Sequence, residues 1–272
     1  MEIYRGKNCI VTGGASGIGA ELCRQLAGYG ANVIVADLNG EGAKVLATEL
    51  GAEAVMLDVT NEEAVRTLVE STAQRLHRLD YMFNNAGIAS LGEVRDTPLA
   101  QWKRVLDINL YGVLYGALAA YPIMLRQRSG HIVNTASGYG LAPGVGVAPY
   151  VTSKFAVVGF SEVLRMEAAA LGVSVSTICP GFVRTPILDA RPEDRIDAVE
   201  MLRRIPVATI TARDAAQRAL RGVAKKQAII AFPGYVKVLA GLHRFAPYLF
   251  NLFQKKTLEN LRALRINVTD PA

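Results

Sequence analysis

The sequence predicts a doubly wound α/β fold, in which helices cover both faces of a parallel sheet of about seven strands. Short runs rich in β-branched residues alternate along the chain with longer segments of helical period. Such alternation is typical of parallel sheets, because each return to the same edge of the sheet needs a crossover helix. The chain has 272 residues, 51% of them hydrophobic, which is enough to bury the core of one α/β domain.

The predicted strands are short and apolar, and the segments between them are long enough for helices. Residues 61–78, for example, place apolar side chains along one side of a helix. The uncharged stretch 108–125 is long enough to raise the question of a membrane span, but its Asn109 and Pro122 favour a helix buried in the fold. The predicted strands cover residues 8–12, 32–37, 54–57, 79–83, 131–134, 173–178 and 227–231.

Two segments depart from this alternation. Residues 183–205 contain Pro186 and Pro192 between a strand pattern and a helix pattern, and their length predicts a mobile cover over a site. Beyond residue 231 the pattern changes to an aromatic, basic extension. No linker rich in proline or serine interrupts the body. We therefore expect residues 1–231 to form one body and residues 232–272 to be an extension of the same domain.

A glycine-rich turn follows the first predicted strand and precedes a helical pattern. Gly13 allows a sharp exit from the strand, Gly17 lets the backbone approach a pyrophosphate, and Gly19 allows close packing of helix on sheet. The helix N-terminus then faces the anion. Glycine-rich turns also occur between elements without any binding role, but the strand before this turn and the helix after it favour a dinucleotide site.

An acidic residue, Asp37, ends the second predicted strand. A carboxylate there accepts hydrogen bonds from the adenosine ribose hydroxyls and repels a 2′-phosphate. Leu38 follows it, and Ser16 rather than Arg or Lys precedes Gly17, so the neighbourhood offers no obvious phosphate clamp. The sequence therefore favours NAD over NADP.

The ends of the third and fourth predicted strands carry polar residues with two interpretations each. Asp58 either receives the adenine amino group or, with Thr60, forms a turn or helix cap. The run 84–87, Asn-Asn-Ala-Gly, either lets the chain pass close to the cofactor or uses its asparagines to bridge neighbouring strands.

Three side chains predict acid–base chemistry on the substrate side. Tyr150 and Lys154 lie four residues apart at the start of the helical pattern 151–171, so both project from one face. Ser137 ends the preceding strand, and a glycine-rich link joins the two elements. Because strand ends on this side of a doubly wound sheet open onto the ligand crevice, the three side chains should converge there.

With these motifs in order, residues 7 to about 231 resemble the short-chain dehydrogenase/reductase family. The resemblance implies a Rossmann-like dinucleotide-binding and catalytic domain for residues 1–231, and a homodimer or homotetramer assembled through the long helical segments 98–128 and 150–171. It implies Asn109, Ser137, Tyr150 and Lys154 as catalytic residues. The predicted cofactor contacts are Gly13, Ser16, Gly17, Ile18, Gly19, Asp37, Asp58, Val59, Asn85, Ala86, Gly87, Tyr150, Lys154, Pro180, Gly181, Val183 and Thr185, the last at the position where family members bind the nicotinamide carboxamide.

The chemistry of these side chains agrees with that resemblance. A free phenol has a pKa of about 10, so Tyr150 needs its anion stabilised to act as a base near neutrality. The Lys154 ammonium would lower that pKa by Coulomb attraction and hold the nicotinamide ribose hydroxyls. Ser137 would hydrogen-bond the substrate oxygen. Asn109 either holds a water that links Lys154 to solvent, as in the family, or satisfies a neighbouring backbone group.

The expected pocket walls are residues 89–91, 139–147 and 182–188, which flank the serine, the tyrosine and the cofactor loops. Most of these residues are small or apolar. Arg184 is the one candidate for a carboxylate or phosphate clamp. We therefore expect a lipophilic secondary alcohol or ketone as substrate.

The extension 232–272 alternates apolar and aromatic residues with basic ones and holds six Lys/Arg against two Asp/Glu. It is either a peripheral membrane anchor or a helical extension packed on the body, on a neighbouring subunit or over the substrate mouth. Surface helices commonly carry such an apolar stripe, which favours the packed extension.

Composition and charge indicate which partners the protein binds and in which compartment of the cell it lies. The net charge is +6, but basic and acidic residues are interleaved in the body, so no nucleic-acid partner is expected. The three cysteines and three histidines are scattered, which predicts reduced thiols and no metal site. Residues 1–7 carry both charge signs, so we expect no targeting segment and a cytoplasmic location. Two alternatives to an NAD-dependent enzyme stay open: an NADPH-linked carbonyl reductase, and a dinucleotide-binding sensor or scaffold without turnover.

Overall fold

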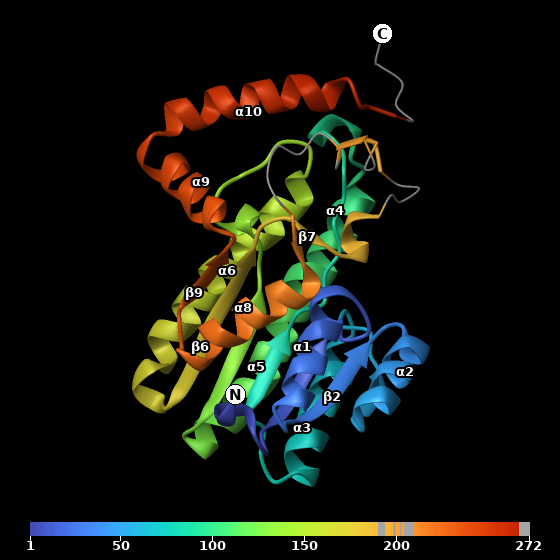
Figure 1. The fold of residues 1–272 in the computed structure, drawn as a ribbon, viewed down its shortest axis with the longest axis vertical. Helices are drawn as coiled ribbons and strands as arrows, with labels where there is room; N and C mark the ends of the chain where they lie inside the picture. The colour runs from blue at the N-terminus through green and yellow to red at the C-terminus, as the bar shows by residue number, and fades with distance from the viewer. Residues whose placement is uncertain (190–193, 198–199, 202, 204–208, 267–272) are drawn as a thin grey trace.

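Seven parallel strands form the central sheet of the computed structural model, which describes residues 1–189, 194–197, 200, 201, 203 and 209–266 (Figure 1). The strand order is β3-β2-β1-β4-β5-β6-β9, and every neighbouring pair is parallel. The predicted fold class and all seven strands are confirmed, with differences only at strand ends. The strands are β1 Asn8–Thr12, β2 Asn32–Asp37, β3 Glu53–Met56, β4 Tyr81–Asn84, β5 Gly130–Thr135, β6 Val173–Pro180 and β9 Ile229–Phe232.

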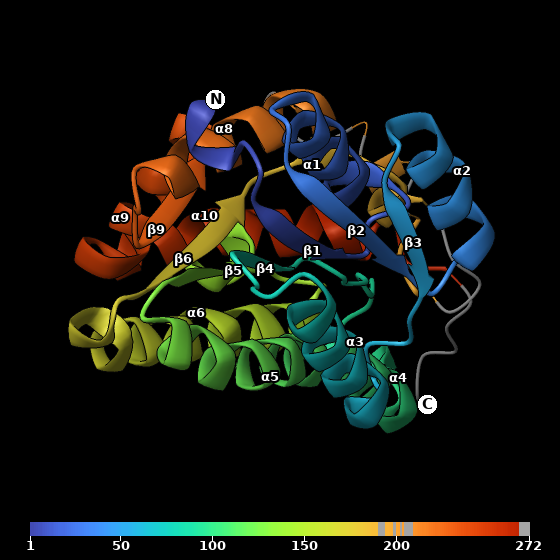
Figure 2. The ribbon, with the colours of Figure 1, turned by 90° about the horizontal axis from the view of Figure 1, so that it is seen from below.

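Helices cover both faces of this sheet, as Figure 2 shows. α1, α2 and α8 lie on one face and share one apolar core, and α3, α5 and α6 share a second core on the other face. The buried runs of β1 and β4 contribute to both cores, because their side chains alternate between the two faces. The helices are α1 Gly17–Gly28, α2 Gly40–Leu50, α3 Glu62–Arg75, α4 Leu99–Leu106, α5 Gly112–Gln127, α6 Ala148–Ala168 and α8 Ala212–Ala224.

The strand order reverses next to β1, which pairs with β2 on one side and with β4 on the other. The connections that follow β1 and β4 therefore run to opposite faces of the sheet and leave a crevice at the carboxyl ends of the strands. Two further helices, α9 (Gly234–Phe245) and α10 (Pro247–Arg262), lie beyond this edge of the sheet, at the top of Figure 1. The extension is thus helical and covers the ligand-binding end.

The predicted helix 98–128 is interrupted by a π-helical turn, Asp107–Tyr111, which joins α4 to α5. Residues Leu99–Gln127 together are long and apolar enough to cross a membrane by length and composition. However, α5 packs on α3 and β5, and its Ala117 and Ala120 are fully buried. We therefore interpret this segment as a core helix.

Two features of the described chain were not predicted. A separate two-stranded parallel sheet pairs β7 (Val183–Arg184) with β8 (Ile210–Thr211), and two-residue strands are too short for a periodicity signal. The helix predicted to start near residue 150 begins at Ala148, because Pro149 suits the first turn of a helix. The proposed mobile cover, 183–205, lies partly outside the described residues.

Candidate active site

A cavity of about 840 Å³ opens at the carboxyl edge of the sheet, where the strand order predicts a ligand crevice. It runs from the β1–α1 turn, past the ends of β2 to β6, to the inner face of α10. Every residue predicted for the site lines this cavity except Gly19 and Asn109. The fold therefore brings together side chains that lie far apart in sequence.

The β1–α1 turn has the space and the donors that a pyrophosphate requires. Gly13 and Gly17 adopt left-handed backbone conformations, with φ of +63° and +54°. A Cβ at Gly13 would lie 2.8 Å from the Ala86 Cα, and one at Gly17 would lie 3.1 Å from the Thr185 Cβ. Because α1 begins at Gly17, the free amides of its first turn lie at the cavity. These observations fit a dinucleotide phosphate at this end of the cavity.

Gly19 holds the turn together and does not line the cavity. A Cβ at this position would lie 2.0 Å from the Gly13 carbonyl oxygen and 2.6 Å from Asn85 Nδ2. The close packing of α1 on the sheet therefore requires glycine here, which is the packing role expected from the sequence.

Asp37 lies at the cavity end of β2 in a fixed orientation. Its Oδ2 accepts a hydrogen bond from the Ala15 amide at 2.9 Å, and its Oδ1 accepts one from the Asn39 amide at 2.9 Å. Each carboxylate oxygen keeps further acceptor capacity. The carboxylate is thus held beside the glycine turn, where a ribose with two free hydroxyls would find acceptors.

Asp58 and Asn85, for which the sequence left two interpretations open, mainly form hydrogen bonds that hold the local backbone in place. Asp58 Oδ1 accepts hydrogen bonds from the Thr60 amide at 2.9 Å and the Thr60 hydroxyl at 2.8 Å, so the turn-forming role is present, although Asp58 also lines the cavity. Asn85 Nδ2 donates to the carbonyl oxygens of Thr12 and Gly13 at 3.1 and 3.3 Å. Asn85 therefore ties β4 to the glycine turn on β1.

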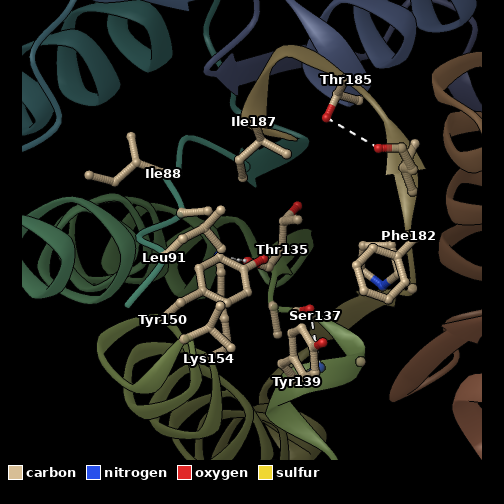
Figure 3. A pocket seen from close by; sticks show the side chains of 18 of the residues that line it. Ile88, Leu91, Thr135, Ser137, Tyr139, Tyr150, Lys154, Phe182, Thr185 and Ile187 are labelled. Atoms are coloured by element: carbon tan, nitrogen blue, oxygen red, sulfur yellow. Dashed lines mark hydrogen bonds between the residues drawn. The ribbon is translucent and has the colours of Figure 1, made fainter. Parts of the chain in front are cut away.

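Ser137, Tyr150 and Lys154 face one part of the cavity, as Figure 3 shows. Ser137 follows β5 and accepts a hydrogen bond from the Tyr139 amide at 3.1 Å. The Lys154 Nζ lies 5.5 Å from the centre of the Tyr150 ring and donates to the Thr135 carbonyl at 2.9 Å. One turn of α6 separates the tyrosine from the lysine, so the helix presents both to the end of β5.

Burial controls the protonation of this group. It lowers the pKa of Lys154 to about 8 and raises the pKa of the Tyr150 phenol above its ordinary value of 10. The hydrogen bond with Ser137 acts in the opposite direction on Tyr150. The net lowering of the Tyr150 pKa by Lys154 that the sequence argument expected is not found here, because burial of the phenol is the larger effect.

Asn109 lies behind the cavity wall, fully buried in the π-helical turn. Its Oδ1 accepts from the Ile88 amide at 2.8 Å, and its Nδ2 donates to the Ile88 carbonyl at 2.9 Å and to Ser153 Oγ at 3.2 Å. The backbone-satisfying interpretation is therefore the one that these contacts support. Asn109 holds the loop after β4 against α6, next to Lys154.

The substrate end of the cavity is largely apolar, and two parts of its wall were missed. The expected segments contribute Leu91, Tyr139, Val145 and Phe182, whereas Arg184 is exposed and does not line the cavity. The one candidate for an arginine clamp therefore does not line the cavity, which agrees with the expectation of an apolar pocket. The missed residues come from the segment between β4 and α5 and from the extension, and they are Ile88, Ile108, Tyr235, Val236, Leu239, Phe250, Phe253, Gln254, Lys256, Thr257, Asn260, Leu261 and Leu264.

The extension packs over the cavity mouth, one of the placements that the sequence left open. Arg262 pairs with Glu93 at 3.1 Å, and Arg265 pairs with Asp96 at 3.0 Å. Gln254 donates to the Pro143 carbonyl at 3.0 Å. Residues 250, 254, 257, 261 and 264 recur at helical spacing, which is the signal that would have identified this inner face.

A model of the short chain dehydrogenase family matches residues 7–196 of this chain. The chain belongs to the short-chain dehydrogenase/reductase family. The chain is 37% identical over 222 residues to borneol dehydrogenase, mitochondrial, of Lavandula x intermedia, covering 81% of this chain and 84% of the relative. It is 38% identical over 191 residues to a 3-alpha-(or 20-beta)-hydroxysteroid dehydrogenase of Mycobacterium bovis, covering 70% and 74% of the two chains.

A solved structure of a short chain dehydrogenase/reductase from Burkholderia phymatum in complex with NAD has the same fold. Its TM-score is 0.81 at 28% sequence identity, and the match covers 100% of this chain and 99% of that chain. The match therefore spans the extension as well as residues 7–196. As a member of this family, the chain is an oxidoreductase, and the solved structure that shares its fold contains NAD.

Proposed function

We propose that this enzyme interconverts a lipophilic secondary alcohol and a ketone with NAD(H), using Tyr150 as general acid and base. The observation that carries the proposal is the single cavity, which joins the Ser137, Tyr150 and Lys154 group to the β1–α1 turn and to an apolar wall. Relatives named as borneol and hydroxysteroid dehydrogenases, which act on compact apolar alcohols by their names, support the substrate class.

The side chains of this enzyme hold the substrate oxygen and move one proton. Ser137 Oγ donates a hydrogen bond to that oxygen, while the Tyr150 hydroxyl gives a proton to the ketone oxygen in reduction and the Tyr150 phenolate takes a proton from the alcohol in oxidation. When bound, the nicotinamide supplies or accepts the hydride at the carbinol carbon. Lys154 lies close enough to Tyr150 to stabilise its anion while the proton is away.

The raised pKa of Tyr150 gives the two directions different pH dependence. Ketone reduction uses the protonated phenol, which is the dominant form at neutral pH. Alcohol oxidation needs the phenolate, so its rate should rise as the pH rises toward the pKa of Tyr150.

The choice between the two cofactors depends on Asp37. Its carboxylate, held by two backbone amides, would accept hydrogen bonds from free ribose hydroxyls and repel a 2′-phosphate. The Asp37→Ala variant is expected to raise the KM for NAD about 10- to 100-fold, since each lost hydrogen bond to a charged group is worth roughly 1.5–3 kcal/mol. Steady-state kinetics with NAD and NADP would measure this effect, and the KM for NADP should not rise.

Asn39→Ala provides the control, because it removes a neighbouring polar side chain and leaves the Asp37 carboxylate in place. A wild-type enzyme that prefers NADP would contradict the cofactor assignment and favour an NADPH-linked reductase.

The substrate class is tested by initial rates on secondary alcohols and ketones graded in chain length and ring content. Because the cavity wall is apolar, kcat/KM is expected to rise with lipophilicity, by roughly fourfold for each buried CH₂ at about 0.8 kcal/mol. Oxidation should be assayed at neutral and alkaline pH. Tight NADH binding without turnover of any compound would instead favour a non-catalytic sensor or scaffold.

Assembly and location complete the proposal. Exposed apolar side chains on α5 and α6, among them Leu118, Phe155 and Met166, suit a homodimer or homotetramer interface. The three cysteines that the structure describes are buried and unpaired, which fits a reducing compartment such as the cytoplasm. A gel-filtration or ultracentrifugation measurement would give the number of copies.

A further inference from the structure

The outer side of the extension exposes large apolar residues although its inner side is packed on the body. On α10, Phe250 and Leu261 are buried against the cavity. On the opposite side, near the corner between α9 and α10, Phe245 is 83% exposed, Tyr248 74%, Leu249 56% and Leu252 51%. These four residues, together with Val238 on α9, are called the tail ridge below.

The tail ridge is a cluster and not a scatter of single apolar residues. Phe245 is the last residue of α9. Tyr248, Leu249 and Leu252 lie in the first two turns of α10. Val238 lies two helical turns before Phe245 on the same side of α9 and is 69% exposed. Figure 1 shows the α9–α10 corner at the margin of the molecule, away from the sheet. Single exposed apolar residues are ordinary, whereas several large exposed apolar residues gathered at one corner mark an interaction surface.

Positive charges border the tail ridge. Lys237 and Arg244 are exposed on α9 next to Val238 and Phe245, and Lys255 and Lys256 follow Leu252 by one helical turn. Glu259 is the only acidic residue between positions 234 and 266. The surface therefore combines apolar side chains at the corner with cations one turn behind them.

We propose that the tail ridge docks peripherally on an anionic lipid surface. Phe245, Leu249 and Leu252 enter the boundary between headgroups and acyl chains, and Tyr248 keeps its hydroxyl among the headgroups. Long basic side chains extend their charges to lipid phosphates while their stems stay on the apolar side. An anionic bilayer complements both the apolar cluster and its positive border.

A second copy of this chain is a poorer partner for the same surface. A twofold contact between two tail ridges would bring two surfaces with the same positive border together, because an isologous interface pairs a patch with itself. Arg244 and Lys255 of both copies would then lie at one interface, with Glu259 as the nearby acid in this segment. Like charges facing each other disfavour such a contact.

The docking surface and the cavity share the helix α10, so docking would place the cavity mouth close to the lipid. α10 carries cavity-lining residues on its inner side and, on its outer side, the tail ridge residues Tyr248, Leu249 and Leu252. A lipophilic alcohol dissolved in the bilayer would then reach the cavity mouth without crossing water. This last step rests on the proposed function, whereas the docking itself does not.

Vesicle co-sedimentation tests the docking without any assay of turnover. The full chain is incubated with phosphatidylcholine vesicles with and without phosphatidylglycerol, at low and high salt. Wild type is expected to sediment with the anionic vesicles and to be released by high salt. The triple variant Phe245→Ser, Leu249→Ser, Leu252→Ser should lose at least tenfold in vesicle partitioning, and Arg244→Gln with Lys255→Gln should lose the dependence on phosphatidylglycerol.

The control removes equally exposed apolar side chains elsewhere, with Val45→Ser on α2 and Leu99→Ser on α4. This variant should bind vesicles as wild type does. None of the five substituted ridge and border residues lines the cavity, so turnover of a water-soluble alcohol should persist in all variants. That readout separates failure of the docking from failure of the proposed function.

Two results would overturn the docking proposal. One is the absence of wild-type binding to anionic vesicles at low salt, or equal binding by the triple variant. The other is a change of oligomeric state in the triple variant by analytical ultracentrifugation, which would identify the tail ridge as a contact between copies.

Discussion

Replacing Tyr150 with phenylalanine is expected to reduce kcat about 10³-fold in both directions, while the affinity for NADH stays unchanged. The substitution removes one hydroxyl from a ring that faces the cavity beside Ser137 and Lys154 (Figure 3). General acid–base catalysis typically contributes 10² to 10⁴ in rate, and no other proposed group delivers a proton to the substrate oxygen. Ser137 would still orient the substrate, so KM should change little.

Stopped-flow or steady-state turnover together with NADH fluorescence titration measures both quantities. Tyr121→Phe is the matched control, because it removes the same hydroxyl from a partly buried residue that packs against the core and does not line the cavity. If Tyr150→Phe retained most of the wild-type kcat, another group would have to transfer the proton, and the proposed mechanism would be wrong.

Lys154→Met is expected to stabilise the folded chain relative to wild type near neutral pH, and this advantage should shrink as the pH rises. Burial lowers the pKa of Lys154 from 10.5 to about 8. Between these two values the unfolded chain binds a proton that the folded chain has released, so the free energy of unfolding of wild type increases with pH. The change attributable to this one group is about 3 kcal/mol.

Below pH 8 both states hold the proton, and wild type bears the full cost of a buried charge. The variant lacks this titration, so the difference in unfolding free energy between variant and wild type should fall by about 3 kcal/mol between pH 7 and pH 10.5. Loss of the hydrogen bond to the Thr135 carbonyl subtracts a constant amount at both pH values.

Urea denaturation of both proteins at the two pH values gives this difference directly, and comparing the pair cancels the titration of the other side chains. Lys44→Met on α2 is the control, since Lys44 is exposed and its replacement should give the same difference at both pH values. An unchanged difference for Lys154→Met would show that the ammonium is not held in the low-dielectric environment that its burial indicates.

Most of the fold could be predicted because its signals are local. Strands such as Asn8–Thr12 and Asn32–Asp37 lie inside a parallel sheet that helices cover on both faces. Their sequences are therefore mostly apolar and stand out between the helical patterns. The glycine turn after β1 was predictable for the same reason, since its backbone conformation and its close contacts exclude other residues.

The parts of the site that were missed depend on tertiary packing. Asn109 has a family role by position, yet its contacts to Ile88 and Ser153 follow from a π-helical turn that no periodicity reports. The direction of the Tyr150 pKa shift depends on how completely the walls enclose the ring. The place of α10 over the mouth rests on contacts with Glu93 and Asp96, far away in the chain.

The division of the cavity between distant parts of the chain has a consequence for how selectivity could change during evolution. The nucleotide end is built before residue 187, whereas much of the substrate wall comes from α9 and α10 at the end of the chain. Mutations or exchanges in the last two helices would therefore alter which alcohols enter while the hydride-transfer machinery stays intact. Grafting this terminal segment between homologues offers a route to new substrate selectivity without changing Ser137, Tyr150 and Lys154, provided that acidic partners for Arg262 and Arg265 are kept.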